Sequence, residues 1–550
     1  MLKLAGFLAS TFALDVIEVT DDFEKESHVI WDSYMEKEEP LYNWYEYEGT
    51  SIKSFHGGQI HFLNVTSQQW LDESKAVGPQ GSVWSHIVAV NIPKNLKHTN
   101  ISLAYATGWC NERPDNYLPE ADDEDIFTAD QLAHDAQMIA ITVFQIPNCH
   151  ITYPSDPKHK ARQEDGVLAW AWREFHGDPT NYEWLPRMPM AKAVFQSMRA
   201  AQDFVNNDLK VAEVDNWMVA GASKRGWTTW MVGVTDCKNC VNIAGIMPLV
   251  PIMPNLLDGA HQQWKSYGGW TFAFYDYVDA GIMQWLDDEI FGNLTHFLDP
   301  LSYKDRLAKI PKYIMLSSDD EFMMFDWTSK YFDQFAGLGE TKLLISPNSE
   351  HSLATAIPNV VSSVATIARS IAEGKTAEER PSFDYEHDGD KTITITIPEG
   401  GPKPTGVYLR HAETFSNIRR DFRWIVKASD DNKNCSLPWI HLPKGEEDDI
   451  MAKYNFEGEP KDLCLQLIDW HKQTLKETEK GSGVYVGTAP EPKKDGHWVG
   501  YFIEVVFDGD TDRNGLIFKN EYVMTSPGWV HPDTYPFEDC YLDTCTNTEV

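Results

Sequence analysis

The fold is decided by residues 216–227, which read Asn-Trp-Met-Val-Ala-Gly-Ala-Ser-Lys-Arg-Gly-Trp. The apolar run at 216–220 is typical of a buried strand, and a helix is predicted to begin near Lys224. A serine at such a strand-to-helix bend, here Ser223, projects its hydroxyl above the sheet, beside the positive end of the helix dipole. The two small residues before it suit this tight turn, because bulk there would clash. The pattern predicts a nucleophilic serine.

The motif departs from the usual GxSxG sequence at Arg225, where that motif has glycine; the next glycine is Gly226. An alternative interpretation is a serine that only caps a buried helix. The rest of the chain decides between the two, because a serine nucleophile needs a base to accept its proton and an acid to orient that base. In α/β-hydrolases the acid and then the histidine follow the serine, each on a loop after a late strand.

Two late predicted strands are followed by these residue types. Residues 312–317 lead directly into Asp319 and Asp320, and residues 342–346 lead to His351. Order, strand context and loop placement therefore favour a catalytic triad over a capping serine. Either aspartate is the candidate acid, because adjacent carboxylates on one loop cannot be ranked by sequence.

A serine hydrolase also needs two hydrogen-bond donors for the oxyanion of its tetrahedral intermediate. One is predicted to be the backbone N–H of Lys224, directly after the serine, and the other an N–H of the loop after an early strand. Gly108 and Trp109 follow the predicted strand at 101–105 and suit that place. The alternative for Gly108 is a simple turn.

Strand-like and helical segments alternate over residues 50–378, which predicts an α/β domain with a mainly parallel sheet. Several strands are apolar throughout, as expected where helices cover both faces. The predicted strands, in chain order, are residues 82–91, 101–105, 138–145, 216–220, 241–250, 312–317 and 342–346. Residues 190–205 and 354–373 predict helices with an apolar face.

Residues 255–310 are predicted to form a helical cap over the serine. The aromatic residues within them could line a substrate pocket or only pack the cap onto the domain. The candidate substrate-binding residues are Trp264, Tyr267 and Trp270.

Charged side chains near the serine also have two interpretations. Lys224 and Arg225 either bind an anionic substrate group or pair with acidic neighbours, and pairing is favoured. Glu164 and Asp165 either anchor a substrate amine or cap a helix, and the structural role is favoured.

The pattern changes beyond residue 378. Period-two alternation at 391–397 is followed by short predicted strands at 406–410, 421–428, 500–507 and 517–524. Residues 379–550 are therefore predicted to form an antiparallel β domain, a sandwich interrupted near 430–495 by a polar insertion.

Composition restricts the partners. The 550 residues carry 47 Lys plus Arg and 83 Asp plus Glu, a formal charge of −36. Nucleic-acid binding needs a basic footprint, so this charge argues against it. No apolar stretch reaches the roughly 18–20 residues of a membrane-spanning helix, which argues against membrane insertion. Phosphate-loop, HExxH and EF-hand motifs are missing from the sequence, so no cofactor or metal is predicted.

Residues 1–13 resemble a secretory signal peptide cut after Ala13, followed by an N-terminal extension at 14–49; the alternative is an ordinary apolar N-terminus. Eight cysteines, an even number, suit disulfides in an oxidising compartment. The lone CxxC at 237–240 indicates a local disulfide or free thiols rather than zinc. N-glycosylation triplets begin at Asn64, Asn100, Asn293 and Asn434.

The ten residues Gly-Ala-Ser-Lys-Arg-Gly-Trp-Thr-Thr-Trp at 221–230 resemble the hallmark of the PhoPQ-activated pathogenicity-related family. The similarity spans about residues 40–537, and the cysteines and glycosylation triplets favour the secreted eukaryotic branch, the autocrine proliferation repressors. Further matching segments are 145–148, 163–165, 170–172, 189–193, 248–251, 320–322, 347–352, 420–423 and 522–536.

This resemblance implies an exported protein with an α/β-hydrolase-like domain followed by a β domain. By motif position it implies Ser223 as nucleophile, Asp320 as acid and His351 as base. The first hypothesis is a secreted serine hydrolase that acts on peptide or ester bonds. The second is an extracellular signalling protein that represses proliferation by binding a cell-surface receptor, on a hydrolase scaffold without turnover.

Overall fold

The computed structural model describes residues 21–111, 117–251, 253–427, 463–466, 468–509, 519–546 and 548–550. The predicted signal peptide and the triplet at Asn434 lie outside these ranges. Within them, no helix combines the length and apolar character needed to cross a bilayer.

A ten-stranded mixed sheet forms the centre of the molecule, in the order β1-β3-β4-β6-β5-β9-β10-β11-β12 with β2 paired to β3. The six strands from β6 to β12 in this order run parallel, and β1, β3 and β4 pair antiparallel. This is the strand order of an α/β-hydrolase sheet, so the predicted fold class is confirmed. The bounds are β1 Asn43–Glu46, β2 Ile52–Lys53, β3 Gln59–Gln69, β4 Val83–Ile92, β5 His98–Ala106, β6 Met138–Val143, β9 Asn216–Ala222, β10 Asn242–Leu249, β11 Lys312–Ser317 and β12 Thr341–Ser346.

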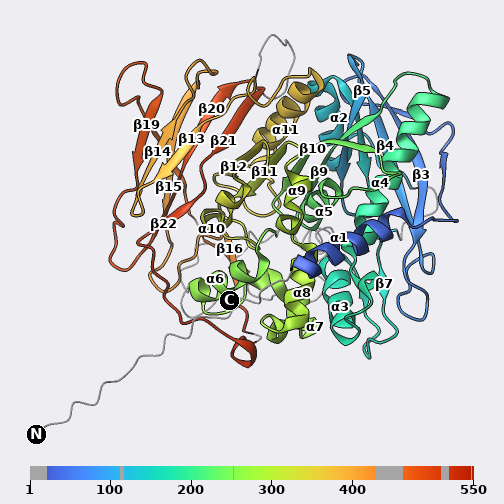
Figure 1. Cartoon of the computed structure of the whole chain (residues 1–550), viewed down its shortest axis with the longest axis horizontal. Coiled ribbons are helices and arrows are strands. Elements are labelled where there is room, and N and C mark those ends of the chain that lie inside the picture. Colours follow the sequence, from blue (N-terminus) through green and yellow to red (C-terminus); the bar gives the residue numbers. More distant parts are fainter. Residues whose placement is uncertain are drawn as a thin grey trace, which may run out of the picture.

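Helices cover both faces of this sheet (Figure 1). On β9, Trp217 and Val219 join the core under α4 and α5, and Met218 and Ala220 join the core under α2 and α11. Because side chains alternate along a strand, cover on both sides requires apolar residues throughout, as the sequence has. The helices outside the cap are α1 Asp21–Glu36, α2 Glu124–Ala136, α3 Glu164–Gly177, α4 Arg187–Asp203, α5 Lys224–Gly233, α10 Thr328–Tyr331 and α11 Ile357–Ala372.

Most of a group of helices between β10 and β11 occupies the lower part of Figure 1, next to α3, and the last of them, α9, lies higher in the view. These helices lie within residues 255–310, the segment predicted as a cap. They are α6 Leu256–Tyr267, α7 Tyr275–Ala280, α8 Glu289–Leu298 and α9 Lys304–Leu307. A two-stranded ribbon, β7 Ile151–Thr152 with β8 Ala161–Arg162, precedes α3.

Two antiparallel sheets follow at the C-terminus and lie at the left of Figure 1. Ile393 and Ile395 of one sheet share a core with Leu409 and Ile503 of the other, so the two sheets pack face to face. One sheet contains β13 Asp384–His387, β14 Thr392–Thr396 and β19 Val484–Thr488. The other contains β15 Gly406–Glu413, β18 His471–Thr474, β20 Val499–Asp508, β21 Glu521–Thr525 and β22 Trp529–His531, and a separate pair is β16 Ile425–Lys427 with β17 Leu463–Leu465.

The predicted polar insertion at 430–495 differs from the structure in its described part. Residues 463–495 carry β17, β18 and β19. All four residues of β18 are exposed, and β18 and β19 each lie at the edge of a sheet. An edge strand that faces water can be polar on both faces, so its sequence lacks the alternation that predicts a strand.

Disulfides confirm one prediction from the cysteine content. The described residues contain the pairs Cys110–Cys149, Cys237–Cys240 and Cys540–Cys545. The CxxC motif is therefore closed as a local disulfide, and its sulfurs are not metal ligands.

Candidate active site

Ser223, Asp320 and His351 come together at one edge of the sheet. They follow β9, β11 and β12, which are parallel and separated by at most two neighbouring strands. The carboxyl ends of parallel strands meet at the same edge, which is where open α/β sheets bind ligands. Loops far apart in the chain thus reach one point.

Ser223 occupies the sharp turn between β9 and α5. Its backbone is left-handed, with φ 59° and ψ −124°, and its N–H donates to the carbonyl of Leu249 at 2.9 Å. A Cβ on Gly226 would lie 2.3 Å from that same carbonyl oxygen, so only glycine lets α5 pack this closely on β10. The shifted glycine of the motif therefore serves helix packing, and the serine still has the strained geometry typical of a nucleophile.

A chain of hydrogen bonds joins the three side chains. His351 Nε2 lies 2.8 Å from Ser223 Oγ, and His351 Nδ1 lies 2.8 and 2.9 Å from the two carboxylate oxygens of Asp320. Asp320 Oδ1 also accepts the backbone N–H groups of Phe322 and Met323, which fixes the carboxylate. The ring of Phe322 packs on the imidazole, with centroids 4.3 Å apart. A serine hydroxyl, an imidazole and a carboxylate thus lie in hydrogen-bonding reach of one another, the arrangement that a catalytic triad requires.

Asp319, the alternative acid, bonds elsewhere. Its Oδ1 accepts the indole N–H of Trp470 at 2.8 Å, and its Oδ2 accepts from Ser318 Oγ and from the N–H of Ser349. Burial raises the pKa of Asp319 well above its ordinary value. This carboxyl ties the loop after β11 to the C-terminal region, and the contact with His351 belongs to Asp320.

Glu321, a residue with no role predicted from the sequence, contacts the backbone of His351. Its Oε2 accepts the backbone N–H of His351 at 3.0 Å, and its Oε1 is buried without a hydrogen-bond partner in the described chain. Burial first, and then the negative charges of Asp320 and Glu350, raise the pKa of Glu321 well above its ordinary value. Nothing in the sequence separates Glu321 from the other acidic residues of this loop.

The raised pKa of Glu321 leads to a pH-dependent prediction. Glu321 binds its proton more tightly in the folded protein than in the unfolded chain. The free energy of unfolding should therefore fall as pH rises above the pKa of this carboxyl in the unfolded chain, near 4.5. Glu321→Gln, which resembles the protonated form, should therefore raise Tm at about pH 8 by about 2–4 °C. Below about pH 4 the variant and the wild-type protein should have the same Tm, because Glu321 is protonated in both the folded and the unfolded state there. Differential scanning calorimetry over this range tests it, and an equal gain at every pH would contradict it.

The loop after β5 lies beside Ser223. Ala106 pairs with Gly221 in parallel register, so Gly108 continues alongside Ser223. Lys224 is the first residue of α5, where backbone N–H groups have no partner within the helix. Trp109 has a left-handed backbone, with φ 79°, and its ring packs on Phe144. The three predicted oxyanion residues are thus adjacent to the serine along the chain or across the sheet.

Lys224 and Arg225 pair with acidic neighbours, as the favoured interpretation has it. Lys224 Nζ lies 2.9 Å from Glu164 and 2.8 Å from Asp165, and Arg225 also pairs with Glu164. Although burial opposes ionisation, the two cations hold the pKa of Glu164 down, to about 2. Glu164 and Asp165 are thus occupied by ion pairs at the start of α3.

The Arg225 guanidinium lies where three loops meet. Its Nε donates to the carbonyl of Ile146 after β6, its Nη2 bonds Glu164, and a Cβ on Gly108 would lie 2.8 Å from that same Nη2. A side chain at 108 would displace the guanidinium, so glycine is required. Arg225 thus fixes the loop that carries Gly108 relative to α5, the helix that begins directly after Ser223.

We expect Arg225→Lys to lower kcat by about ten- to hundredfold, because displacement of positioning groups by about 1 Å costs that much. Lysine keeps the charge but cannot bond Ile146 and Glu164 together. The matched control is Arg380→Lys, which alters a buried pair with Glu340 before the amino end of β12. The control should lose stability but not kcat; equal kcat losses in both variants would contradict a positioning role.

The aromatic residues predicted to bind substrate lie mainly in the core. Trp270 is fully buried and its indole N–H donates to Thr546, while Tyr267 is 3% exposed beneath the guanidinium of Arg423. Trp264 is half-buried with its ring against Trp270. These rings pack α6 and the residues after it against the rest of the protein. The packing interpretation of the aromatic residues therefore fits the structure better than the substrate-binding interpretation. Aromatic residues serve pockets and cores equally well, so the sequence could not separate the two.

The described asparagines of the glycosylation triplets differ in accessibility. Asn100 is exposed on β5, whereas Asn293 on α8 is half-buried. Asn64 on β3 is half-buried, and its amide donates to the Tyr47 hydroxyl at 3.0 Å. Asn100 is therefore the most accessible acceptor among these three.

Among the described residues, one cluster has metal-ligating groups close enough to share an ion: His261, Asp539 and Cys540. Cys540 is in a disulfide, and His261 bonds both Asp287 and Asp539 at 2.8 and 2.9 Å. Because the protein itself uses these donors, the cluster attaches the C-terminal segment to α6.

Comparison with known proteins places this site in a family. Residues 32–423 match the model of the PhoPQ-activated pathogenicity-related proteins. The chain belongs to this family. A curated relative is autocrine proliferation repressor protein A of Dictyostelium discoideum, 32% identical over 521 residues that cover 92% of each chain. The resemblance drawn from the motifs is thereby confirmed.

Solved structures with some likeness are acetyl xylan esterases. That of Thermoanaerobacterium sp. JW/SL YS485 is 12% identical, covers 62% of this chain and 93% of its own, and has a TM-score of 0.35. That of Paenibacillus sp. R4 is 13% identical, covers 62% of this chain and 95% of its own, and has a TM-score of 0.36. These values are too low to bear on activity or substrate.

Proposed function

We propose that this member of the family is a serine hydrolase. The observation that carries the proposal is the hydrogen-bonded chain from Ser223 Oγ through His351 to Asp320 at the carboxyl edge of the sheet. A serine that only capped a helix would not need a histidine at 2.8 Å or a carboxylate behind that histidine. The strained backbone of Ser223 supports the same conclusion.

In the proposed mechanism, Ser223 Oγ attacks the substrate carbonyl while His351 Nε2 accepts its proton. Asp320 holds the Nδ1–H tautomer and stabilises the imidazolium without itself becoming protonated. The backbone N–H of Lys224 and that of Gly108 or Trp109 donate to the oxyanion. His351 then protonates the leaving group, which leaves an acyl-enzyme that water hydrolyses by the same steps.

The proposed substrates are esters or peptides, since both react through this chemistry. Paired series of chromogenic esters and amides with matched acyl groups test the proposal. We expect saturable hydrolysis of at least one series by the wild-type protein. Turnover of neither series, by protein with a cooperative melting transition, would overturn it.

A second candidate function comes from the relative's name: an exported protein that represses proliferation through a cell-surface receptor. The 32% identity over 92% of both chains and the disulfides are the observations that favour it. Secretion and glycosylation are part of this proposal. Adding purified wild-type protein and Ser223→Ala to growing cells tests it: equal repression by both would make the signal independent of catalysis, and no repression by either would reject it.

A further inference from the structure

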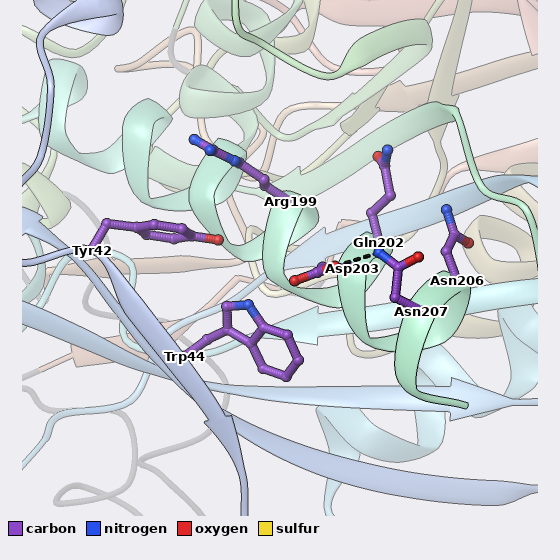
Figure 2. A pocket seen from close by; sticks show the side chains of 7 residues that line it. All are labelled: Tyr42, Trp44, Arg199, Gln202, Asp203, Asn206 and Asn207. Atoms are coloured by element: carbon purple, nitrogen blue, oxygen red, sulfur yellow. Dashed lines mark hydrogen bonds between the residues drawn. The ribbon is translucent and has the colours of Figure 1, made fainter. Parts of the chain in front are cut away.

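A pocket away from the triad lies at the outer edge of the large sheet. It encloses about 360 Å³ between β1 and the C-terminal end of α4 (Figure 2). Because β1 is first in the strand order and β9 is sixth, the pocket lies about 24 Å from the strand of Ser223, at about 4.8 Å per strand. Its lining residues are Tyr42, Trp44, Arg199, Gln202, Asp203, Asn206 and Asn207.

One wall of the pocket is the polar, solvent-accessible side of α4 near its C-terminal end. The spacing i, i+3, i+4, i+7, i+8 places residues on one helical face, and earlier in α4 the buried residues include Ala191, Val194 and Met198. In the last turns and in the π-helical turn Phe204–Asp208, Ala200, Ala201, Phe204 and Val205 stay buried, and half-buried or exposed polar groups line the pocket. Such π turns recur at functional sites. The residues at this spacing are Arg199, Gln202, Asp203, Asn206 and Asn207.

The protein holds several of these side chains in place. Gln202 Oε1 accepts the indole N–H of Trp217 at 3.1 Å, and Asn206 bonds both backbone groups of Val214. Asn207 Nδ2 donates to Asp203 Oδ1. Polar groups fixed in this way lose little conformational entropy when a ligand binds.

Other polar atoms of the pocket bond no described residue. They are Asp203 Oδ2, the indole N–H of Trp44 and the N–H groups of Arg199, whose guanidinium lies 5.1 Å from the centre of the Tyr42 ring. The pocket therefore offers a charged acceptor, a charged donor and a neutral donor beside two aromatic rings. Figure 2 shows the Asp203 carboxylate directed toward the side of the pocket where the rings of Tyr42 and Trp44 lie.

The balance of charge indicates the class of ligand. Asp203 would repel an anion drawn to Arg199, and Arg199 would repel a cation drawn to Asp203. A neutral ligand with several neighbouring hydroxyl groups avoids this repulsion. Each hydroxyl can donate and accept, so together they can bond the carboxylate, the guanidinium and the indole N–H of the pocket. The C–H faces of a sugar ring would bury the aromatic surface. We propose that this pocket is a binding site for a neutral saccharide, separate from the triad.

Isothermal titration calorimetry with cellobiose, xylobiose, mannobiose, lactose and N,N′-diacetylchitobiose tests this proposal. We expect saturable binding of at least one of these disaccharides by the wild-type protein. Trp44→Ala should abolish it, and Asp203→Asn should weaken it about tenfold, as expected for loss of a charged hydrogen bond. Tyr45→Ala is the matched control: this neighbouring ring is 50% exposed and does not line the pocket, so binding should be unchanged.

Binding should also survive when Ser223 is blocked by a fluorophosphonate, because the two sites are separate. If blocking Ser223 abolished binding, the saccharide would bind at the triad, and the proposal would be overturned. Absence of binding to every disaccharide would overturn it, as would unchanged binding by Asp203→Asn, whose exposed position leaves the fold intact. None of these outcomes depends on whether the triad is catalytic.

Discussion

Replacing Ser223 by alanine should reduce kcat by at least about a thousandfold on any substrate that the wild-type protein hydrolyses. The hydroxyl removed is the one 2.8 Å from His351 Nε2, and no other described side chain bonds that nitrogen. Alanine keeps the Cβ in the strained turn, so the free energy of unfolding should change by less than about 1 kcal/mol. Steady-state kinetics together with thermal melting measure both quantities.

A matched control is Ser352→Ala, on the loop that carries His351. Ser352 is exposed; its hydroxyl donates to Glu350 and accepts the backbone N–H of Ala354, and neither partner is a triad residue. This variant should keep wild-type kcat. If Ser223→Ala retained activity within about tenfold, the nucleophile would be another residue, since such a small loss is far below that expected of a nucleophile.

The second large effect concerns the two neighbouring aspartates. Asp320→Asn should lower kcat by about ten-thousandfold, because the amide favours the wrong tautomer of the imidazole and cannot stabilise its positive form. Asp319→Asn should keep kcat within about tenfold and lose stability, since that carboxyl bonds Trp470, Ser318 and Ser349 and leaves His351 untouched.

Comparing kcat and Tm for this pair separates the acid from its structural neighbour. The two variants have the same chemical change, one residue apart, on one buried loop. Equal losses of kcat in the two variants, or a larger loss in Asp319→Asn, would contradict the role of Asp320 as the acid that orients His351.

Features that depend on local pattern were predictable from the sequence. The strand at 312–317 was predicted with the bounds that β11 has, because a buried parallel strand is apolar on both faces. The loops of Ser223 and His351 followed from the parallel strands, since their ends meet at one edge. By contrast, β3 was not predicted. Seven of its eleven residues are histidine, asparagine, serine, threonine or glutamine, so the strand lacks an apolar pattern. Buried hydrogen bonds, such as that of Gln68 to Pro189, satisfy such groups in the fold and have no local signature.

Features that depend on side-chain partners were not predictable. Two adjacent aspartates look alike in the sequence, and only the direction of each side chain distinguishes the contact with His351 from the contact with Trp470. The role of Arg225 likewise depends on contacts with Ile146 and Gly108, which precede it by 79 and 117 residues. Local sequence patterns carry no information about contacts at such separations. The polar face of α4 became visible as a pocket only when β1 was placed opposite it.

The most direct test of the central claim is to locate the covalent adduct of a fluorophosphonate by peptide mass spectrometry. We expect a single adduct on Ser223 in the wild-type protein, formed much more slowly in Asp320→Asn and not at all in Ser223→Ala. A folded wild-type protein that forms no adduct, or that carries it on another residue, would contradict the account.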